Sequence, residues 1–342
     1  MTSSLAAEPT TRPRSEFKPL VERIQAAGLM ERRPGYYLGY ALALAAGTLV
    51  AAYGLTQVSA LAAVLVVAPL AAVLSSQVGF LGHDAGHQQI SASHRRNRWF
   101  GLLAGDLCGG LSYGWWQDKH LRHHAHPNHE GLDPDVGEGV ISWSERQQAK
   151  KSGFARWFGR HQAVLFFPLL TLEGWNLKYN SFRTLHERPR RERRVEVALL
   201  VIHYAVYAGF LGWALGPLAA VAFIVVHQAF YGLILGAAFA PNHKGMAMPE
   251  RSDRLDHLRK QVLTSRDVTG GPWVDFALGG LNHQVTHHLF PSMARPHLKR
   301  ARPIVRDYCA EIGLDYRACG VVESYAECLR YLHRVGAEPT PS

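Results

Sequence analysis

The sequence predicts an all-α integral membrane protein with four transmembrane helices, paired as two hairpins, and a helical cap on the cytoplasmic side. Three observations lead to this prediction. Four apolar runs of about twenty residues carry no charged side chain, two-residue joints separate the members of each pair, and arginines gather at one end of the runs. The mean hydropathy of −0.08 hides the pattern, because charged residues and most of the 19 histidines lie between the runs.

The first hairpin is expected from 36–55 and from 58 to about 80, and the second from 197–215 and 218–240. Each run is close to the roughly 20 residues that cross a hydrocarbon layer about 30 Å thick. The joint Gly216–Pro217 favours a tight turn. The alternative, four buried helices of a soluble protein, fits poorly with uncharged runs arranged as two hairpins. A signal peptide also fits poorly, because the first run begins only after a polar, charged amino terminus and is immediately followed by another.

A shorter apolar stretch, 162–172, contains Pro168 and predicts a helix at about 162–177 that lies in the membrane interface. The arginine-rich segments at 31–34, 94–98 and 188–194 then fall on one side of the membrane. The positive-inside rule makes that side cytoplasmic, which places both termini in the cytoplasm and the protein in the cell (inner) membrane.

Residues 1–30 are expected to be a disordered polar segment, 31–336 a single membrane domain, and 337–342 a tail. The net charge of +10 is accounted for by basic residues beside anionic lipid, and nothing resembles a nucleic-acid-binding module. The four cysteines show no CxxC spacing, so neither a zinc site nor an iron–sulfur centre is indicated.

Three histidine clusters follow the apolar runs: HDAGH, HLRHH and QVTHH. The candidate ligands in them are His83, His87, His120, His123, His124, Gln284, His287 and His288, and His243 stands alone after the last run. Residues three and four apart share a helix face, so His83 can point at one metal with His87, and His120 with His123 and His124. Adjacent histidines lie about 100° apart and can serve two metals. So many imidazoles are costly to bury without a cation, and the clusters therefore predict two metal ions.

The stretches HDAGH, WWQDKHLRHHAHPN with DPDV, and GGLNHQVTHHLFPSM resemble the three histidine boxes of the membrane fatty-acid desaturase family, in the branch whose third box is QxxHH. The similarity runs from about Gly35 to about Gly336. It implies a non-haem diiron enzyme that uses O2 and two electrons to convert an acyl chain to its unsaturated product. By this resemblance the seven box histidines are iron ligands. Gln284 stands where related enzymes have histidine, and His243 where the family often supplies one further ligand.

The chain departs from the family at His283, usually an aromatic residue, and at Thr286, often an acid. On a helix His283 would share the face of His287 and substitute for the weak ligand Gln284. Residues expected to accept the second N–H of the ligand imidazoles are Asp84, Asp133, Asp135 and Asn282, with His283 beside them. For Asp133 and Asp135 a simple turn with a helix cap is an equal alternative.

The resemblance implies a fatty acyl substrate carried by CoA, a carrier protein or a membrane lipid. No haem, flavin or nicotinamide motif is found in the sequence, so a separate ferredoxin, rubredoxin or small cytochrome with its reductase is expected as electron donor. One alternative within the same chemistry is a membrane diiron hydroxylase, ketolase or epoxidase acting on an alkyl or terpenoid chain. From a different class, a metal transporter or sensor would need ionisable residues along a path through the membrane, where only His203 and His227 lie.

Overall fold

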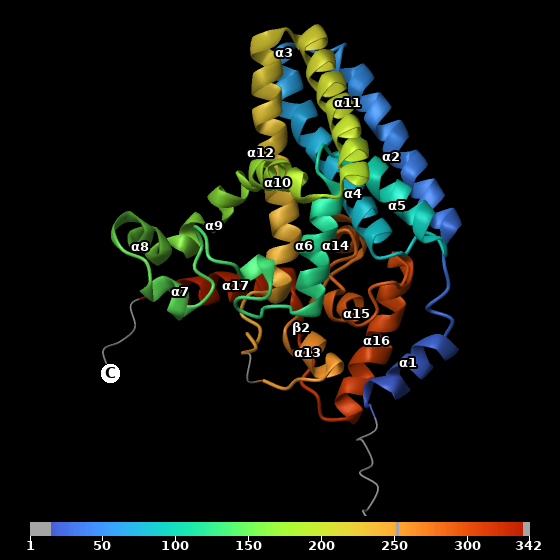
Figure 1. Ribbon diagram of the computed structural model, residues 1–342, viewed down its shortest axis with the longest axis vertical. Coiled ribbons are helices and arrows are strands. Elements are labelled where there is room, and N and C mark those ends of the chain that lie inside the picture. Colours follow the sequence, from blue (N-terminus) through green and yellow to red (C-terminus); the bar gives the residue numbers. More distant parts are fainter. Residues whose placement is uncertain (1–14, 251–252, 338–342) are drawn as a thin grey trace, which may run out of the picture.

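The computed structural model describes residues 15–250 and 253–337 and has four helices long and apolar enough to cross a membrane (Figure 1). They are α2 (Pro34–Leu55), a second helix built from α3 (Ala60–Ala62), η1 (Ala63–Val67) and α4 (Ala68–Gly86), then α11 (Arg190–Leu215) and α12 (Pro217–His243). They form two hairpins whose turns lie at the same end, at the top of Figure 1. The prediction of an all-α membrane protein is confirmed.

The spanning helices are longer at their lower ends than their apolar runs. The helix that was expected to end near residue 80 continues to Gly86, and α12 continues to His243. These extensions carry charged and polar residues below the apolar surface, so His83 and His243 belong to the spanning helices themselves. The second helix begins at Ala60, where the Ser59 hydroxyl accepts a hydrogen bond from the Ala62 N–H at 3.3 Å.

The other elements form the cap and the helices that join it to the spans. They are α1 (Phe17–Ala26), α5 (His94–Leu102), η2 (Leu103–Cys108), α6 (Tyr113–Ala125), η3 (Pro134–Val136), α7 (Glu145–Ala149), α8 (Gly153–Arg160), α9 (Gln162–Leu170), α10 (Glu173–Thr184), η4 (Leu185–Glu187), α13 (His257–Leu263), α14 (Pro272–Ala277), α15 (Gln284–Leu289), α16 (Arg295–Glu311) and α17 (Val321–Gly336). Two short strands that the sequence did not predict, β1 (Asp267–Thr269) and β2 (Ala318–Gly320), pair in parallel.

The expectation that residues 1–30 are disordered is wrong for α1; residues 1–14 lie outside the described part of the chain. Leu20 and Ile24 of α1 are fully buried, in one cluster with Val285 and Leu289 of α15. The amphipathic spacing of these residues lets α1 cover the helix that carries the third histidine box. An N-terminal segment that looks polar on average therefore supports the site.

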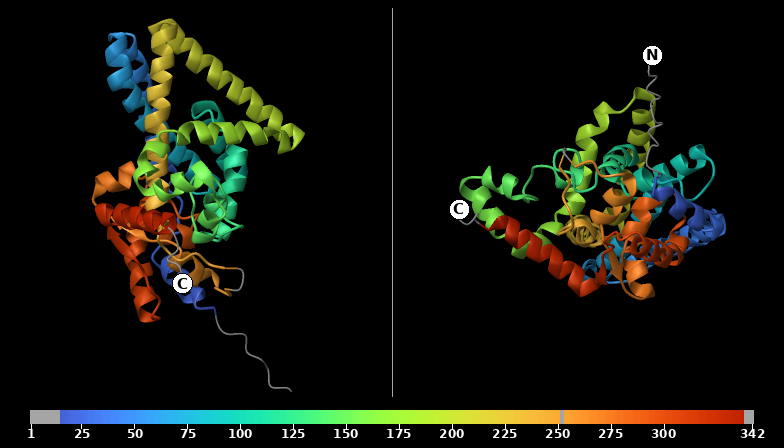
Figure 2. Two further views of the ribbon diagram at one scale, coloured as in Figure 1. Left: turned by 90° about the vertical axis from the view of Figure 1, so that its left-hand side faces the viewer. Right: turned by 90° about the horizontal axis from the view of Figure 1, so that it is seen from below.

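The single interfacial helix expected at about 162–177 is two helices, α9 and α10, separated at Thr171–Leu172. The break lies where the chain packs closely on α12: a Cβ at Gly232 would lie 2.5 Å from both the Leu170 carbonyl oxygen and the Gly174 nitrogen. Figure 2 shows the consequence: α10 crosses α12, while α11 diverges from α12 below their shared turn.

Candidate metal centre

The first histidine box ends helix α4. His83 lies in the last turn and His87 follows as the C-terminal cap, so both rings point to the same side, with centroids 4.7 Å apart. Both side chains are buried. The four-residue spacing read from the sequence is therefore realised by a helix that runs down from the apolar bundle into the cap.

The second box lies on α6, which begins at the Ser112 cap. The Nε2 atom of His120 is 2.8 Å from that of His87 and 3.1 Å from that of His124. His123 lies elsewhere: its ring is 4.7 Å from that of His243, measured between centroids. The helical spacing allowed all three histidines of this box to bind one metal, but His120 and His124 lie beside His87 whereas His123 lies beside His243.

The third box forms the short helix α15, in which His287 and His288 are almost completely buried. Their ring planes lie at 88° to each other, and His288 stacks on His124 with centroids 4.1 Å apart. The centroid of His287 lies 4.8 Å from that of His83, and the centroid of His288 lies 4.8 Å from that of His243.

Two groups of ring nitrogens result, and within each the nitrogens lie within 4.8 Å of one another. We call them the five-histidine group, His83, His87, His120, His124 and His287, and the three-histidine group, His123, His243 and His288. The Gln284 amide adjoins the latter, its Nε2 being 2.9 Å from the His243 Nε2. The structure thus brings together all nine residues that the sequence selected as ligands.

The chemistry of these groups fits metal ions. Within the described residues, no hydrogen-bond partner reaches the buried Nε2 atoms of His83, His287 and His288. Burial, reinforced by the neighbouring imidazoles, holds the pKa of five of the histidines well below the usual value: His87, His120, His124, His287 and His288. Neutral imidazoles with converging, unpartnered nitrogens are costly to bury, and a cation removes that cost.

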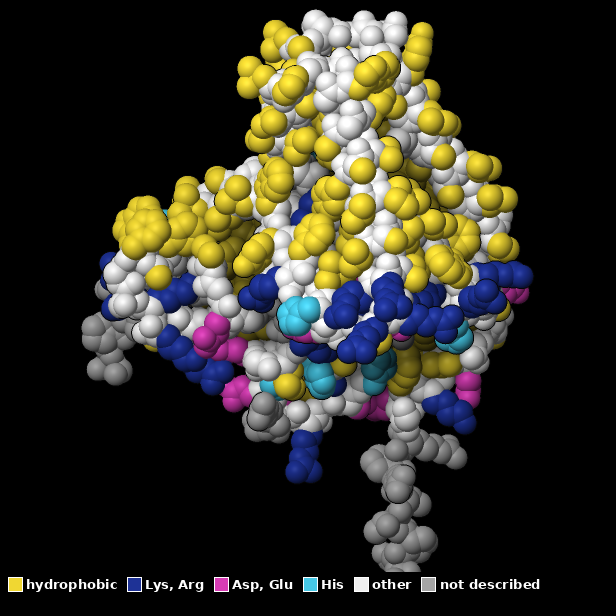
Figure 3. Space-filling model, turned by 45° about the horizontal axis from the view of Figure 1, so that its top comes forward, with side chains coloured by type: hydrophobic (Ala, Val, Ile, Leu, Met, Phe, Trp, Pro, Cys, Tyr) yellow, Lys and Arg dark blue, Asp and Glu magenta, His cyan; other side chains and the backbone are white. Residues whose placement is uncertain are grey.

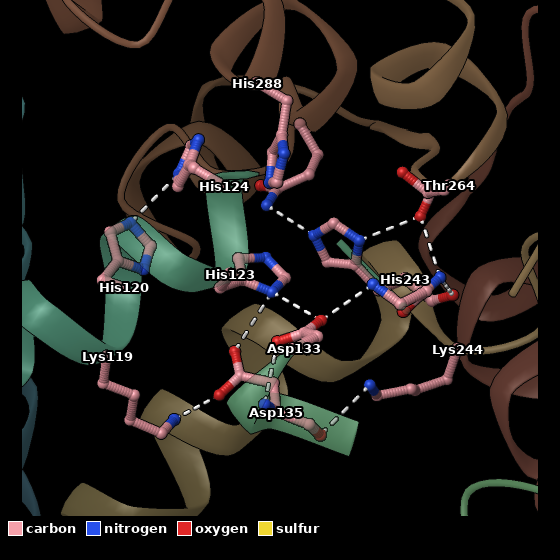
Figure 4. Close-up of polar contacts among 12 residues, drawn as sticks. Lys119, His120, His123, His124, Asp133, Asp135, His243, Lys244, Thr264 and His288 are labelled. Carbon is pink, nitrogen blue, oxygen red and sulfur yellow. Dashed lines mark hydrogen bonds and ion pairs between the residues drawn. The ribbon is translucent and has the colours of Figure 1, made fainter. Parts of the chain in front are cut away.

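Four of the histidines are held by a contact to the other ring nitrogen. The Nδ1 atom of His123 lies 2.9 Å from Asp133 Oδ2 (Figure 4), and that of His83 lies 3.2 Å from Asp84 Oδ1. The remaining two contacts are from His243 Nδ1 to the Thr264 carbonyl oxygen and from His288 Nδ1 to Gln261 Oε1, both at 2.9 Å. Each contact sets the tautomer of the imidazole and leaves its Nε2 directed into one of the two histidine groups. The sequence predicted the two aspartates but not Gln261 or Thr264.

Asp133 makes both contacts that the sequence had left as alternatives. Its Oδ1 accepts the Asp135 N–H at the start of η3, and its Oδ2 faces His123 and also accepts the Asn128 N–H. Asp135 Oδ2 is farther from His123 Nδ1, at 3.5 Å, and Asp135 pairs with Lys119 (Figure 4). Asp133 is therefore at once a turn cap and the support of a ring in the three-histidine group.

Changing Asp133 to asparagine is expected to weaken metal binding about tenfold to a hundredfold, the usual effect of losing such a supporting contact. An amide keeps the shape but has one acceptor oxygen, which cannot serve both the η3 cap and His123. The measurement is a competition titration with a metal chelator. Asp256→Asn is the matched control, since Asp256 also caps a helix, α13, but lies outside both groups. Equal affinity in the Asp133→Asn protein would contradict the prediction.

The structure does not support the expectations for Asn282 and His283. His283 precedes α15 instead of lying on it, and its Nε2 is 3.2 Å from Asp275 Oδ1. Burial lowers the pKa of His283 to about 4, yet its ring lies outside both histidine groups. The Asn282 side chain donates to Asp275 and to the Val268 carbonyl, and contacts no ligand imidazole among the described residues. Both residues brace the turn before α15.

The two histidines within the membrane spans have protein partners. His227 lies between the Ser75 hydroxyl, at 3.0 Å, and the Tyr207 hydroxyl, at 2.6 Å. His203 Nδ1 is 2.9 Å from the Leu107 carbonyl oxygen, near the end of η2. These contacts satisfy the buried His227 and the partly buried His203 within the protein, and the two residues do not form a path of ligands across the membrane.

Gly86 in HDAGH leaves room for Trp116, whose ring stacks on His120 with centroids 4.6 Å apart. A Cβ at Gly86 would lie 2.7 Å from Trp116 Cζ3. Gly86→Ala is therefore expected to destabilise the protein by about 1–3 kcal/mol through overpacking, measured by unfolding in detergent. Gly209→Ala in α11 is the control: no atom lies within 4 Å of its new Cβ, so it should be neutral or stabilising. A stability loss that Trp116→Phe does not relieve would contradict this explanation.

Comparison with known proteins agrees with this geometry. The profile of the family described as fatty acid desaturase matches residues 59–320. An acyl-lipid (9-3)-desaturase of Physcomitrium patens is 28% identical over 80% of this chain and 54% of its own length. A Delta 8-(E)-sphingolipid desaturase of Lachancea kluyveri is 27% identical over 77% of this chain and 50% of its own.

A Delta(8)-fatty-acid desaturase of Helianthus annuus is 25% identical over 93% of this chain and 72% of its own length. The first two of these relatives are matched over only about half of their length. The family match nevertheless covers most of this chain, including all three histidine boxes. This chain therefore belongs to the fatty acid desaturase family.

Proposed function

We propose that this protein is an O2-dependent fatty acyl desaturase that introduces a C=C bond into an acyl chain. The observation that carries the proposal is the pair of adjacent, buried histidine groups within the region that matches the family. In the overall reaction O2 takes up four electrons, two from the acyl chain and two from an external donor. Two hydrogens from the chain and two protons from solvent complete two water molecules.

We infer that the five-histidine group holds one iron ion and that the three-histidine group, with Gln284 beside it, holds a second. Iron bound there would supply the oxidising power that an unactivated C–H bond requires. The residues of the chain keep the ligands neutral through burial, fix their tautomers through the outer contacts, and keep bulk water away from the ring nitrogens.

We further propose that the acyl chain is linked to a membrane lipid and that a separate ferredoxin, rubredoxin or small cytochrome supplies the electrons. The relatives from Physcomitrium patens and Borago officinalis are both named acyl-lipid desaturases, which supports the lipid-linked substrate. The arginines at the start of α11 lie at the same end of the spans as the histidine groups, and this supports a cytoplasmic site in the cell (inner) membrane.

The test is a fatty-acid profile, by gas chromatography–mass spectrometry, of a host expressing the chain. A new unsaturated acid should appear with the intact chain and be absent with His287→Ala/His288→Ala. The control, His161→Ala/His186→Ala, changes two exposed histidines outside the groups and should retain the product. Analysis by lipid class separates lipid-linked from CoA-linked substrates. A hydroxylated product would show the oxygenase reaction in place of desaturation. An unchanged profile in a host that has compatible electron donors would refute the proposal.

A further inference from the structure

The helix α5 carries a groove of about 510 Å³ that is separate from both histidine groups. It is lined by Ser93, Arg95, Arg96, Trp99, Phe100 and Leu103. The volume falls in the range of ordinary ligand sites, roughly 300–1,000 Å³. Because α5 packs against α4, the groove lies beside the spanning bundle.

The lining residues have a polar end and an apolar end. Arg96, Trp99, Phe100 and Leu103 follow the spacing of one helix face, so the charge at the start of α5 leads into an apolar strip. The three apolar side chains are large and partly exposed, at 46%, 37% and 43% respectively. Such a strip would be unfavourable in water and is expected in contact with lipid chains, with the tryptophan near the headgroups.

The arginines of the groove also have no carboxylate partner in the part of the chain that the structure describes. In the run HRRNR, Arg98 lies 3.6 Å from Glu192 of α11. No carboxylate within the described residues reaches ion-pair distance of Arg95 or Arg96. Figure 3 shows Lys and Arg side chains gathered in a band at the lower edge of the apolar surface. Two unpaired guanidinium groups above an apolar strip complement a phosphate that carries acyl chains.

The polar end of the groove is held rigidly by Asn97. This buried side chain donates to the Gln88 side chain and to the carbonyl oxygens of Ser91 and Ser93, at 2.6–3.1 Å, and accepts the Ser91 N–H at 3.0 Å. The segment between His87 and α5 is therefore fixed, which lowers the entropic cost of binding a ligand there.

We propose that this groove is a binding site for one anionic phospholipid, with its phosphate between Arg95 and Arg96 and its acyl chains along Trp99, Phe100 and Leu103. The inference is independent of the proposed desaturation, since it uses no residue of the histidine groups. The bound lipid would lie against the helix that directly follows the first histidine box.

The test is native mass spectrometry of the full chain in detergent, titrated with phosphatidylglycerol or with phosphatidylcholine of the same acyl chains. One phosphatidylglycerol should be retained in preference to phosphatidylcholine. Arg95→Gln/Arg96→Gln should weaken that binding about tenfold or more, because each basic residue near anionic lipid contributes roughly a factor of five. Arg190→Gln/Arg191→Gln, which changes two exposed arginines at the start of α11, should change it less than twofold.

Several outcomes would overturn the proposal. Equal binding of the two lipids would remove the role of charge, and equal weakening by both double variants would show general attraction to a basic surface. Competition by inorganic phosphate as effective as that by lipid would indicate a free-phosphate site. If the first double variant does not fold, phosphatidylglycerol with a photoreactive acyl chain decides with the unaltered protein: labelling at 99–103 is expected, and labelling confined to the spanning helices would contradict it.

Discussion

Single alanine substitutions at His287 and His288 are expected to affect different metal ions. His288 is one of only three imidazoles in its group, so His288→Ala should leave about one iron per chain in place of two. His287 is one of five, so His287→Ala should leave four imidazoles and weaken the binding of its ion without abolishing it. Both variants should lose desaturated product to the background level. Iron per chain, measured by inductively coupled plasma mass spectrometry, distinguishes the two.

His287→Ala should affect the stability of the metal-free protein and of the metal-loaded protein differently. Neither ring nitrogen of His287 has a hydrogen-bond partner among the described residues, although the side chain is fully buried. In the metal-free protein these buried nitrogens without partners are unfavourable, and His287→Ala removes them. The substitution should therefore cost the metal-free protein little stability or stabilise it. The metal-loaded protein should instead be destabilised. Equal losses in both forms would show that His287 is a packing residue and not a ligand.

The control is His161→Ala, an exposed histidine whose Nδ1 lies 2.8 Å from the Trp157 carbonyl oxygen. It should retain two irons and the product. If His287→Ala and His288→Ala gave identical iron contents and affinities, the division into two groups would be wrong.

The architecture was predictable because its signals are local. Runs without charge, joined by two residues, are sufficient for the two hairpins, and a four-residue spacing is sufficient to place His83 and His87 on one face. The sequence could not assign His123 to its group. Residues three and four after His120 lie on either side of it around the helix, so either can share its site, and only packing against α12 and α15 brings His123 to His243 and His288.

The supports of the site were the least predictable part. The partner of His243 is the backbone carbonyl of Thr264. Every residue has such a carbonyl, so the sequence could not single it out. Gln261 on α13 stands in the unremarkable run HLRKQVL and reaches His288 only through the tertiary fold. His283 shows the opposite error: a histidine at helical spacing from His287 was expected to join the site, but the chain enters α15 only at Gln284.

Arg295 is expected to be the charged residue outside the histidine groups whose loss costs most. Its Nε and Nη2 both lie 2.7 Å from Asp84 Oδ2, and Asp84 Oδ1 lies 3.2 Å from the His83 Nδ1. Arg295 and Asp84 are both buried. The backbone makes room for the arginine at Gly280, which has a φ of +81° and where a Cβ would lie 2.7 Å from Arg295 Cγ.

Arg295→Met should therefore destabilise the protein by about 3–5 kcal/mol, because it leaves the Asp84 carboxylate buried and unpaired. The measurement is unfolding in detergent at neutral pH. Adding Asp84→Asn should recover most of the loss, since the amide removes the buried charge while its oxygen can still accept from His83 Nδ1. A double variant as unstable as the sum of the two single variants would contradict this account.

The exposed ion pair between Arg23 and Glu311 tests whether the stability loss in Arg295→Met comes from the burial of Asp84 or from the loss of any ion pair. Arg23 and Glu311 form two hydrogen bonds of 2.7 Å, as close as the Arg295–Asp84 contacts, but both side chains are exposed. Arg23→Met should change stability little, because water solvates the carboxylate that remains. If the Arg23 and Arg295 substitutions had equal effects, the loss at Arg295 would reflect side-chain packing. A larger loss at Arg295, with lower iron affinity that Asp84→Asn partly restores, would identify the Arg295–Asp84 pair as the support of His83.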